Sequence, residues 1–241
     1  MSGPAAGRWR DAGRRLVHAA LAALLPGGLR LFGILSRVDG FLYPQEAVFL
    51  HRLARDAPGA GRILEVGSYC GLSTLCLATG ARRHAEPRVT AVDPQVRGAE
   101  ARLRANLRRF GMTDRVEVVV ATSLETAARW SGPLRVVFID GSHELESVRA
   151  DLAAWLPHVE PGGFLVLHDS TALSSFPGPV EVAREQLREG PVFEAVGRVG
   201  SMTWARRRGA PSNWRPTSPG GRALDALFGG LQRWRIRRST G

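Results

Sequence analysis

Short apolar runs alternate with amphipathic stretches through the middle of this 241-residue chain. The apolar runs predict five strands, over residues 62–67, 88–93, 115–121, 134–140 and 163–168, and the stretches between them predict helices near 71–84, 98–110, 123–131 and 144–157. Strands that alternate with helices are typical of a parallel sheet with crossover helices. Because these strands are almost continuously apolar, helices are expected on both faces of the sheet.

The residues that follow predict how the sheet ends. A helix is expected over 178–190, and two adjacent strands over 192–200 and 201–207 are joined by a Gly-Ser turn. Strands joined by so tight a turn are antiparallel. The expected fold class is therefore α/β, with a seven-stranded, mostly parallel sheet and an antiparallel edge hairpin.

Composition divides the chain into three parts. The apolar run 16–25 follows a basic stretch but is only about ten residues long, too short to span a bilayer, which favours an amphipathic N-terminal helix over an export signal. Residues 1–60 are expected to form a helical lid or oligomerisation segment. Residues 61–208 form the central domain, and residues 209–241 a Pro/Gly-rich linker with a basic amphipathic tail. A cytoplasmic protein is expected.

The net charge of +11 is unevenly distributed. Residues 1–60 contain 8 Arg and 4 acidic residues, residues 61–204 contain 16 and 17, and residues 205–241 contain 9 and 1, with no Lys anywhere. A neutral middle argues against a nucleic-acid groove built into the fold. The tail could lie on an anionic membrane surface, bind an acidic partner, or dock on its own domain.

Cysteine chemistry is not indicated. Cys70 and Cys76 are the two cysteines, and no second Cys/His pair stands at metal spacing. Neither a zinc site nor a disulfide framework is expected.

The stretch "EVGSYCG", Glu65 to Gly71, marks the turn from the first strand into its helix. Ligands of doubly wound sheets bind at this place. The spacing of Gly67 and Gly71, with Tyr69 between them, departs from the G-x-G-x-x-G pattern of dinucleotide sites. An acid beside the turn repels a pyrophosphate and favours an ammonium or sulfonium group.

The longer stretch "ILEVGSYCGLST" resembles the first motif of class I S-adenosylmethionine-dependent methyltransferases, and most closely that of catechol O-methyltransferase. The resemblance implies a Rossmann-like fold and S-adenosylmethionine as cofactor. It implies that Glu65, Gly67, Ser68 and Gly71 form the cofactor turn. Tyr69 would lie against the methionine and the transferred methyl, and Ser73 would bind the carboxylate.

Two further positions match this family. Asp93 ends the second strand, where a carboxylate can accept hydrogen bonds from both ribose hydroxyls. Ser123 follows the third strand at the position where the family touches adenine.

The segment 136–170, which includes "IDGSH" and "LHDS", resembles sugar O-methyltransferases of macrolide biosynthesis. Asp140, also a cofactor-site candidate, and Asp169 end adjacent strands, so both carboxylates could converge on Mg²⁺. A metal there would chelate two oxygens of a diol and lower the pKa of the one to be methylated. His143 would contact the acceptor and take its proton. Alternatively, the two aspartates cap helices and His143 is a surface residue.

The metal site departs from the family pattern. Metal-dependent relatives offer two adjacent oxygen ligands after the fifth strand, whereas Asp169 stands between His168 and Ser170. His168 is a softer candidate for a third metal ligand, which leaves metal dependence open.

The expected function is O-methylation of a small-molecule hydroxyl, on a sugar of a natural product or glycolipid, or on a catechol-like phenol. Tyr43 is expected to contact the acceptor, and a homo-oligomer is expected. One alternative is a non-catalytic cofactor- or nucleotide-binding protein whose basic tails bind a membrane or an acidic partner. Another is an RNA methyltransferase, although the sequence contains no recognisable RNA-binding module.

Overall fold

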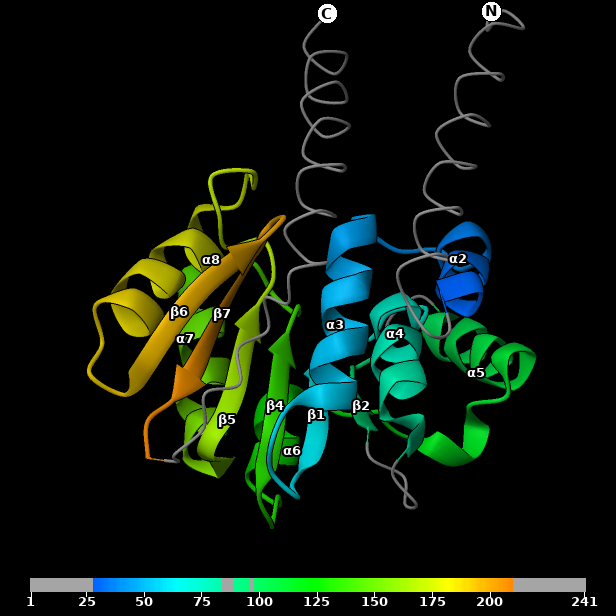
Figure 1. The fold of residues 1–241 in the computed structure, drawn as a ribbon, viewed down its shortest axis with the longest axis horizontal. Helices are drawn as coiled ribbons and strands as arrows, with labels where there is room; N and C mark the ends of the chain where they lie inside the picture. Colours follow the sequence, from blue (N-terminus) through cyan, green and yellow to red (C-terminus); the bar gives the residue numbers. More distant parts are fainter. Residues whose placement is uncertain (1–27, 84–88, 96–97, 210–241) are drawn as a thin grey trace, which may run out of the picture.

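The computed structural model describes residues 28–83, 89–95 and 98–209 (Figure 1). The helix expected at 16–25 and the basic tail lie outside the described residues. The described part folds around one sheet with helices on either side of it (Figure 1).

The sheet has seven strands in the order β3-β2-β1-β4-β5-β7-β6. Their bounds are β1 Arg62–Val66, β2 Val89–Val92, β3 Val116–Val119, β4 Leu134–Ile139, β5 Val159–Leu167, β6 Phe193–Val199 and β7 Met202–Arg207. Strands β1 to β5 are parallel, and β7 pairs antiparallel with both β5 and β6. The predicted mostly parallel sheet with an antiparallel edge hairpin is therefore confirmed.

Helices cover both faces of the sheet (Figure 1). One face is covered by four helices, α2 Gly28–Arg37, α3 Pro44–Asp56, α4 Leu72–Gly80 and α5 Ala99–Phe110. The other face is covered by α6 Ser123–Ala127, α7 Leu145–Trp155 and α8 Pro177–Val182. Helix α8 continues as a π-helical segment, Ala183–Arg188. Short 3₁₀ segments lie at Ala81–Arg83, Thr113–Arg115 and Leu156–His158. Successive strand side chains point to opposite faces, so Val136 and Phe138 enter one core while Val137 and Ile139 enter the other.

Helix α3 belongs to the domain core. Leu50 and Leu53 are fully buried against the first face of the sheet. At the end of the helix, the buried guanidinium of Arg135 donates to the carbonyls of Ala54, at 2.6 Å, and Ala57, at 3.1 Å. These bonds satisfy carbonyls that a helix end leaves unpaired. The chain just ahead of β1 is thereby fixed relative to the sheet.

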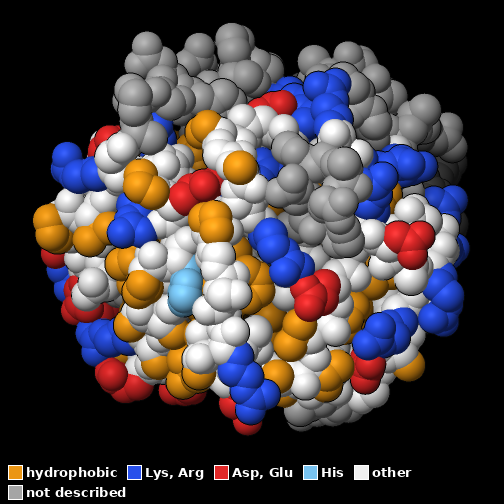
Figure 2. Space-filling view, turned by 90° about the horizontal axis from the view of Figure 1, so that it is seen from below, with side chains coloured by type: hydrophobic (Ala, Val, Ile, Leu, Met, Phe, Trp, Pro, Cys, Tyr) orange, Lys and Arg blue, Asp and Glu red, His pale blue; other side chains and the backbone are white. Residues whose placement is uncertain are grey.

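The side opposite the carboxyl ends of the parallel strands carries mixed charge. Seen from below, acidic and basic side chains are interspersed among apolar ones (Figure 2). This distribution agrees with the near-neutral balance of residues 61–204. Within the described ranges, none of the helices is long and apolar enough to cross a membrane.

Candidate active site

A cavity of about 1140 Å³ opens at the carboxyl edge of the sheet. Its wall comes from the loops that follow β1, β2, β3, β4 and β5 and from the segment just before α3, with further contributions from α7, from Phe176 and from Ser201 in the turn between β6 and β7. The following candidate residues of the sequence line it: Tyr43, Gly67, Ser68, Tyr69, Ser73, Asp93, Ser123, Asp140, His143, His168 and Asp169. Parallel strands bring their carboxyl ends to one edge, and this explains why residues so distant in sequence meet there.

The glycines of the first turn are required by close approaches within the protein. Gly67 has φ +88°, and a Cβ there would lie 2.0 Å from the carbonyl oxygen of Asp140. Gly71 has φ +87°, and its Cβ would lie 2.5 Å from a methyl carbon of Leu103. Gly67 therefore allows the end of β1 to pack directly on the end of β4, in addition to any approach to a ligand.

Asp93 is held in place by backbone donors. Its Oδ2 accepts a hydrogen bond from the Tyr69 amide at 2.8 Å, and its Oδ1 accepts one from the Gln95 amide at 2.6 Å. The Tyr69 hydroxyl accepts a hydrogen bond from Arg102 at 2.6 Å, and the guanidinium lies 5.2 Å from the centre of the tyrosine ring. The turn and the carboxylate that follows β2 are therefore tied together.

The three candidate serines differ in how they are engaged. Ser68 is almost fully buried and accepts a hydrogen bond from the Gln95 side chain at 3.0 Å. Ser123 accepts one from the indole nitrogen of Trp155 at 2.8 Å. Ser73 lies in the first turn of α4 and lines the cavity, and the unpaired amides of a helix start favour an anionic group such as a carboxylate.

Glu65 lies behind the first turn and is fully buried. It accepts a hydrogen bond from the Thr74 hydroxyl, and it is not part of the cavity wall. Burial raises the pKa of this carboxyl to about 8, with hydrogen bonds from Ser73 and Thr74 acting in the opposite direction. The structure therefore places Glu65 as an internal support of the turn, whereas the sequence offered it as a direct ligand contact.

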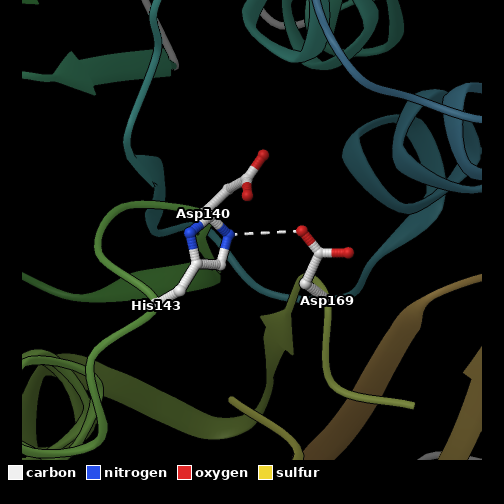
Figure 3. A group of neighbouring side chains, drawn as sticks. All are labelled: Asp140, His143 and Asp169. Carbon is white, nitrogen blue, oxygen red and sulfur yellow. Dashed lines mark hydrogen bonds and ion pairs between the residues drawn. The ribbon is translucent and has the colours of Figure 1, made fainter. Parts of the chain in front are cut away.

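Asp140, His143 and Asp169 come together at the ends of β4 and β5 (Figure 3). His143 and Asp169 point toward each other, and His143 Nε2 lies 3.2 Å from Asp169 Oδ2. One ligand atom from each of the three side chains lies within 4.8 Å of the others. The imidazole stacks on the ring of Phe176 with a centroid distance of 3.9 Å, which orients it in the cavity.

His168 is buried among three carboxylates beside this cluster. Its Nδ1 lies 3.0 Å from Asp140 Oδ1 and 3.4 Å from Asp169 Oδ2, while its Nε2 lies 3.2 Å from the Ser201 hydroxyl. Burial alone lowers the pKa of His168, but the neighbouring carboxylates of Asp140, Asp169 and Glu46 outweigh burial and raise it to about 12. The group whose ligand atoms converge on one space comprises Asp140, His143 and Asp169, whereas His168, which the sequence suggested as a third metal ligand, lies between these carboxylates and Ser201.

The pKa values of the two aspartates shift in opposite directions. Burial raises the pKa of Asp140, although His168 opposes that shift. Burial also works against ionisation of Asp169, but the hydrogen bond and charge of His168, together with His143, lower its pKa. Asp169 is therefore the carboxylate best suited to stabilise positive charge on His143.

The donor set fits a divalent cation. Two carboxylates and the imidazole of His143 converge on one space, and such oxygen and nitrogen ligands suit divalent metals. Ser170 is fully buried, donates to the Leu167 carbonyl at 2.6 Å and accepts from the Thr203 amide at 2.8 Å. It is therefore engaged within the protein, and among the described residues the set comprises Asp140, His143 and Asp169.

Sequence reasoning missed a pair of buried residues beside His168 as well as Phe176. Glu46 in α3 and Ser201 after β6 are both buried and hydrogen-bonded to each other. The spacing of Tyr43 and Glu46 matches a helix N-terminal capping pattern, which could have identified the local role of Glu46. Its contact with Ser201, 155 residues away, leaves no local signal in the sequence.

Comparisons with known proteins agree with this geometry. Residues 64–170 match a family model described as a methyltransferase domain. A catechol O-methyltransferase of Mycobacterium tuberculosis is 44% identical over 101 residues, which are 42% of this chain and 44% of that protein. A mycinamicin VI 2''-O-methyltransferase of Micromonospora griseorubida is 47% identical over 49 residues, 20% of this chain and 12% of that protein. The chain thus aligns with less than half the length of these curated relatives.

Solved structures extend the likeness to most of the chain. The cofactor-bound protein Rv0187 from MTB is 27% identical with a TM-score of 0.58, over 87% of this chain and 99% of that one. An O-methyltransferase from Bacillus cereus in complex with SAH has a TM-score of 0.62 at 21% identity, over 80% of this chain and 97% of that one. Residues 64–170 thus resemble a methyltransferase domain, and the fold of the described residues is the Rossmann-like α/β fold of these solved structures.

Proposed function

We propose that this protein is an S-adenosylmethionine-dependent O-methyltransferase that acts on a hydroxyl group of a small molecule. One observation carries the proposal. A single cavity contains both the glycine turn with Asp93 and the group Asp140, His143 and Asp169. A donor bound on the first set would lie beside an acceptor bound on the second, as group transfer requires.

The cofactor would be held by the residues that follow the first three strands. The amides at the start of α4, next to Ser73, suit its carboxylate, Asp93 suits the ribose hydroxyls and Ser123 lies at the adenine position. When bound, S-adenosylmethionine supplies an electrophilic methyl group on a sulfonium. Asp169 lines the same cavity, and because its pKa is lowered, its carboxylate supplies a negative charge that favours a cation.

His143 is proposed to remove the proton of the acceptor hydroxyl. Among side chains, imidazole is the group best matched to proton transfer near neutral pH. Asp169, 3.2 Å from Nε2, stabilises the positive charge that the ring acquires. Phe176 limits rotation of the ring, so the proton acceptor stays directed into the cavity.

A divalent metal, where present, would be held by Asp140 and Asp169, with His143 beside it. It would supply Lewis-acid chemistry by binding two neighbouring acceptor oxygens and lowering the pKa of one of them. The acceptor is therefore proposed to be a sugar hydroxyl of a natural product or glycolipid, or a catechol-like phenol. The relatives named catechol O-methyltransferase and mycinamicin VI 2''-O-methyltransferase support both classes.

Transfer of a labelled methyl group from S-adenosylmethionine tests the proposal. A catechol and a glycosylated macrolide serve as acceptors, each with and without EDTA, and calorimetry measures cofactor binding separately. We expect cofactor binding and transfer to at least one acceptor class. Binding without transfer to any hydroxyl would favour the non-catalytic alternative, and labelled RNA would favour an RNA methyltransferase. Full activity in EDTA would remove the metal from the mechanism.

The remaining features form part of the same proposal. Residues 1–60 are proposed to form a lid or oligomerisation segment that is anchored to the domain core through α3, residues 61–208 the methyltransferase domain, and residues 209–241 a basic tail. The protein is proposed to be a cytoplasmic homo-oligomer whose tail touches an anionic surface. The nine Arg against one acidic residue in 205–241 support this role for the tail. Sedimentation and vesicle binding, with and without residues 209–241, measure both properties.

A further inference from the structure

Glu46 sits on the side of the catalytic cluster opposite to His143. Its side chain is fully buried in the first turn of α3. Oε1 accepts hydrogen bonds from the Ser201 amide at 2.6 Å and from the Ser201 hydroxyl at 2.8 Å. Oε2 accepts one from the Tyr43 amide at 2.7 Å and lies 3.5 Å from His168 Nε2. One carboxylate therefore joins the cavity wall before α3, the turn between β6 and β7, and His168.

The turn between β6 and β7 is shaped around this carboxylate. Gly200 has φ +59°, and a Cβ there would lie 2.3 Å from Glu46 Oε1. Only a residue without a side chain allows the carboxylate to approach the turn so closely. The turn and Glu46 are thus fitted to each other, although 155 residues separate Glu46 from Ser201.

The hydrogen bonds around His168 determine which groups donate and which accept. The single hydroxyl proton of Ser201 goes to Glu46, so Ser201 Oγ meets His168 Nε2 as an acceptor. The opposite ring nitrogen then faces Asp140 at 3.0 Å and Asp169 at 3.4 Å. Asp169 in turn lies 3.2 Å from His143. Glu46 therefore fixes the plane of the His168 ring, and His168 fixes the positions of the Asp140 and Asp169 carboxylates.

We infer that Glu46 is a positioning residue for methyl transfer, which acts through Ser201 and His168 on Asp140, Asp169 and His143. The inference rests on the proposed function. It also explains how the acceptor side of the cavity, which includes Tyr43 at the start of α3, is connected to the reacting edge of the sheet. Glu46 itself is not part of the cavity wall and is not a catalytic residue.

Glu46→Gln tests this inference, because glutamine keeps the shape but not the charge or the paired acceptors. Loss of a partner behind a reacting group lowers activity by about 10- to 100-fold. We expect kcat to fall by about tenfold or more, while the Kd for S-adenosylmethionine stays within about twofold, because Glu46 is hydrogen-bonded to Tyr43 and Ser201 and not to Ser73, Asp93 or Ser123, which are proposed to hold the cofactor. His51→Gln is the matched control, since His51 is a buried polar residue of the same helix outside the cavity. Any effect of this control variant is expected to lower kcat and cofactor affinity in the same proportion.

Ser201→Ala provides a second, milder variant that removes one hydroxyl from the same path. Since both residues act through His168, the double variant should lose no more kcat than Glu46→Gln alone. If Glu46→Gln does not fold, a fall in kcat for folded Ser201→Ala at unchanged cofactor affinity supports the inference, and an unchanged kcat overturns it. Glu46→Gln with wild-type kcat, or with kcat and cofactor affinity reduced equally, also overturns it. Wild-type protein that transfers no methyl group would instead contradict the proposed function.

Discussion

Replacing Gly67 with alanine tests the close packing on which the site depends. A Cβ at this position would lie 2.0 Å from the Asp140 carbonyl oxygen, and φ is +88°. A left-handed backbone costs a residue with a Cβ about 1–2 kcal/mol. Forcing an extra carbon into a packed interior costs about 1–3 kcal/mol more. We therefore expect the free energy of unfolding to fall by about 2–5 kcal/mol, the sum of the two effects.

Gly111→Ala is the control for the backbone effect alone. Gly111 follows α5 with φ +65°, and a Cβ there would meet nothing within 4 Å. Its free energy of unfolding should fall by only about 1–2 kcal/mol. Urea denaturation of both variants measures the difference. Because Asp140 must move to accommodate the added methyl group, methyl transfer by folded Gly67→Ala should also drop by about tenfold or more. Equal stability losses in the two variants would refute the argument.

Two further changes address His143 and Glu65. His143→Ala should lower kcat by about 10²- to 10⁴-fold in initial-rate assays while calorimetry finds cofactor affinity unchanged, and wild-type kcat would contradict its role as base. Glu65 has a folded-state pKa of about 8, above its ordinary 4.5, so its contribution to stability is fully present below pH 4.5 and is lost as pH rises to 8. In urea denaturation between pH 5 and pH 8, the free energy of unfolding of Glu65→Gln should not show this decline. A decline parallel to that of the wild-type protein would count against a raised pKa of Glu65.

The sheet and its order of elements were predictable because they depend on local patterns. Apolar strands followed by turns and amphipathic helices repeat through residues 61–208, and parallel topology follows from that repetition. Boundaries were less accurate where a turn signal lies inside a strand. Strand β5 begins at Val159, before the Pro161-Gly162-Gly163 stretch, although the sequence predicted a start at residue 163. A register shift in the pairing of β4 with β5 accommodates these residues.

The candidate site was likewise predictable only in part. Asp93, Asp140 and Asp169 could be placed at one edge because each ends a parallel strand. The contacts of His168 with Glu46 and Ser201 could not be predicted, since only the tertiary fold brings these residues beside it. Phe176 was missed for the same reason, because no sequence spacing relates an aromatic residue before α8 to His143.

A crystal structure of the protein with S-adenosylhomocysteine tests the central claim most directly. The account predicts the ribose hydroxyls on Asp93, the amino-acid part over Gly67, and the sulfur facing the space between His143 and Asp169. Product bound away from this cavity, or with its sulfur turned from His143, would contradict the claim that donor and acceptor share one site.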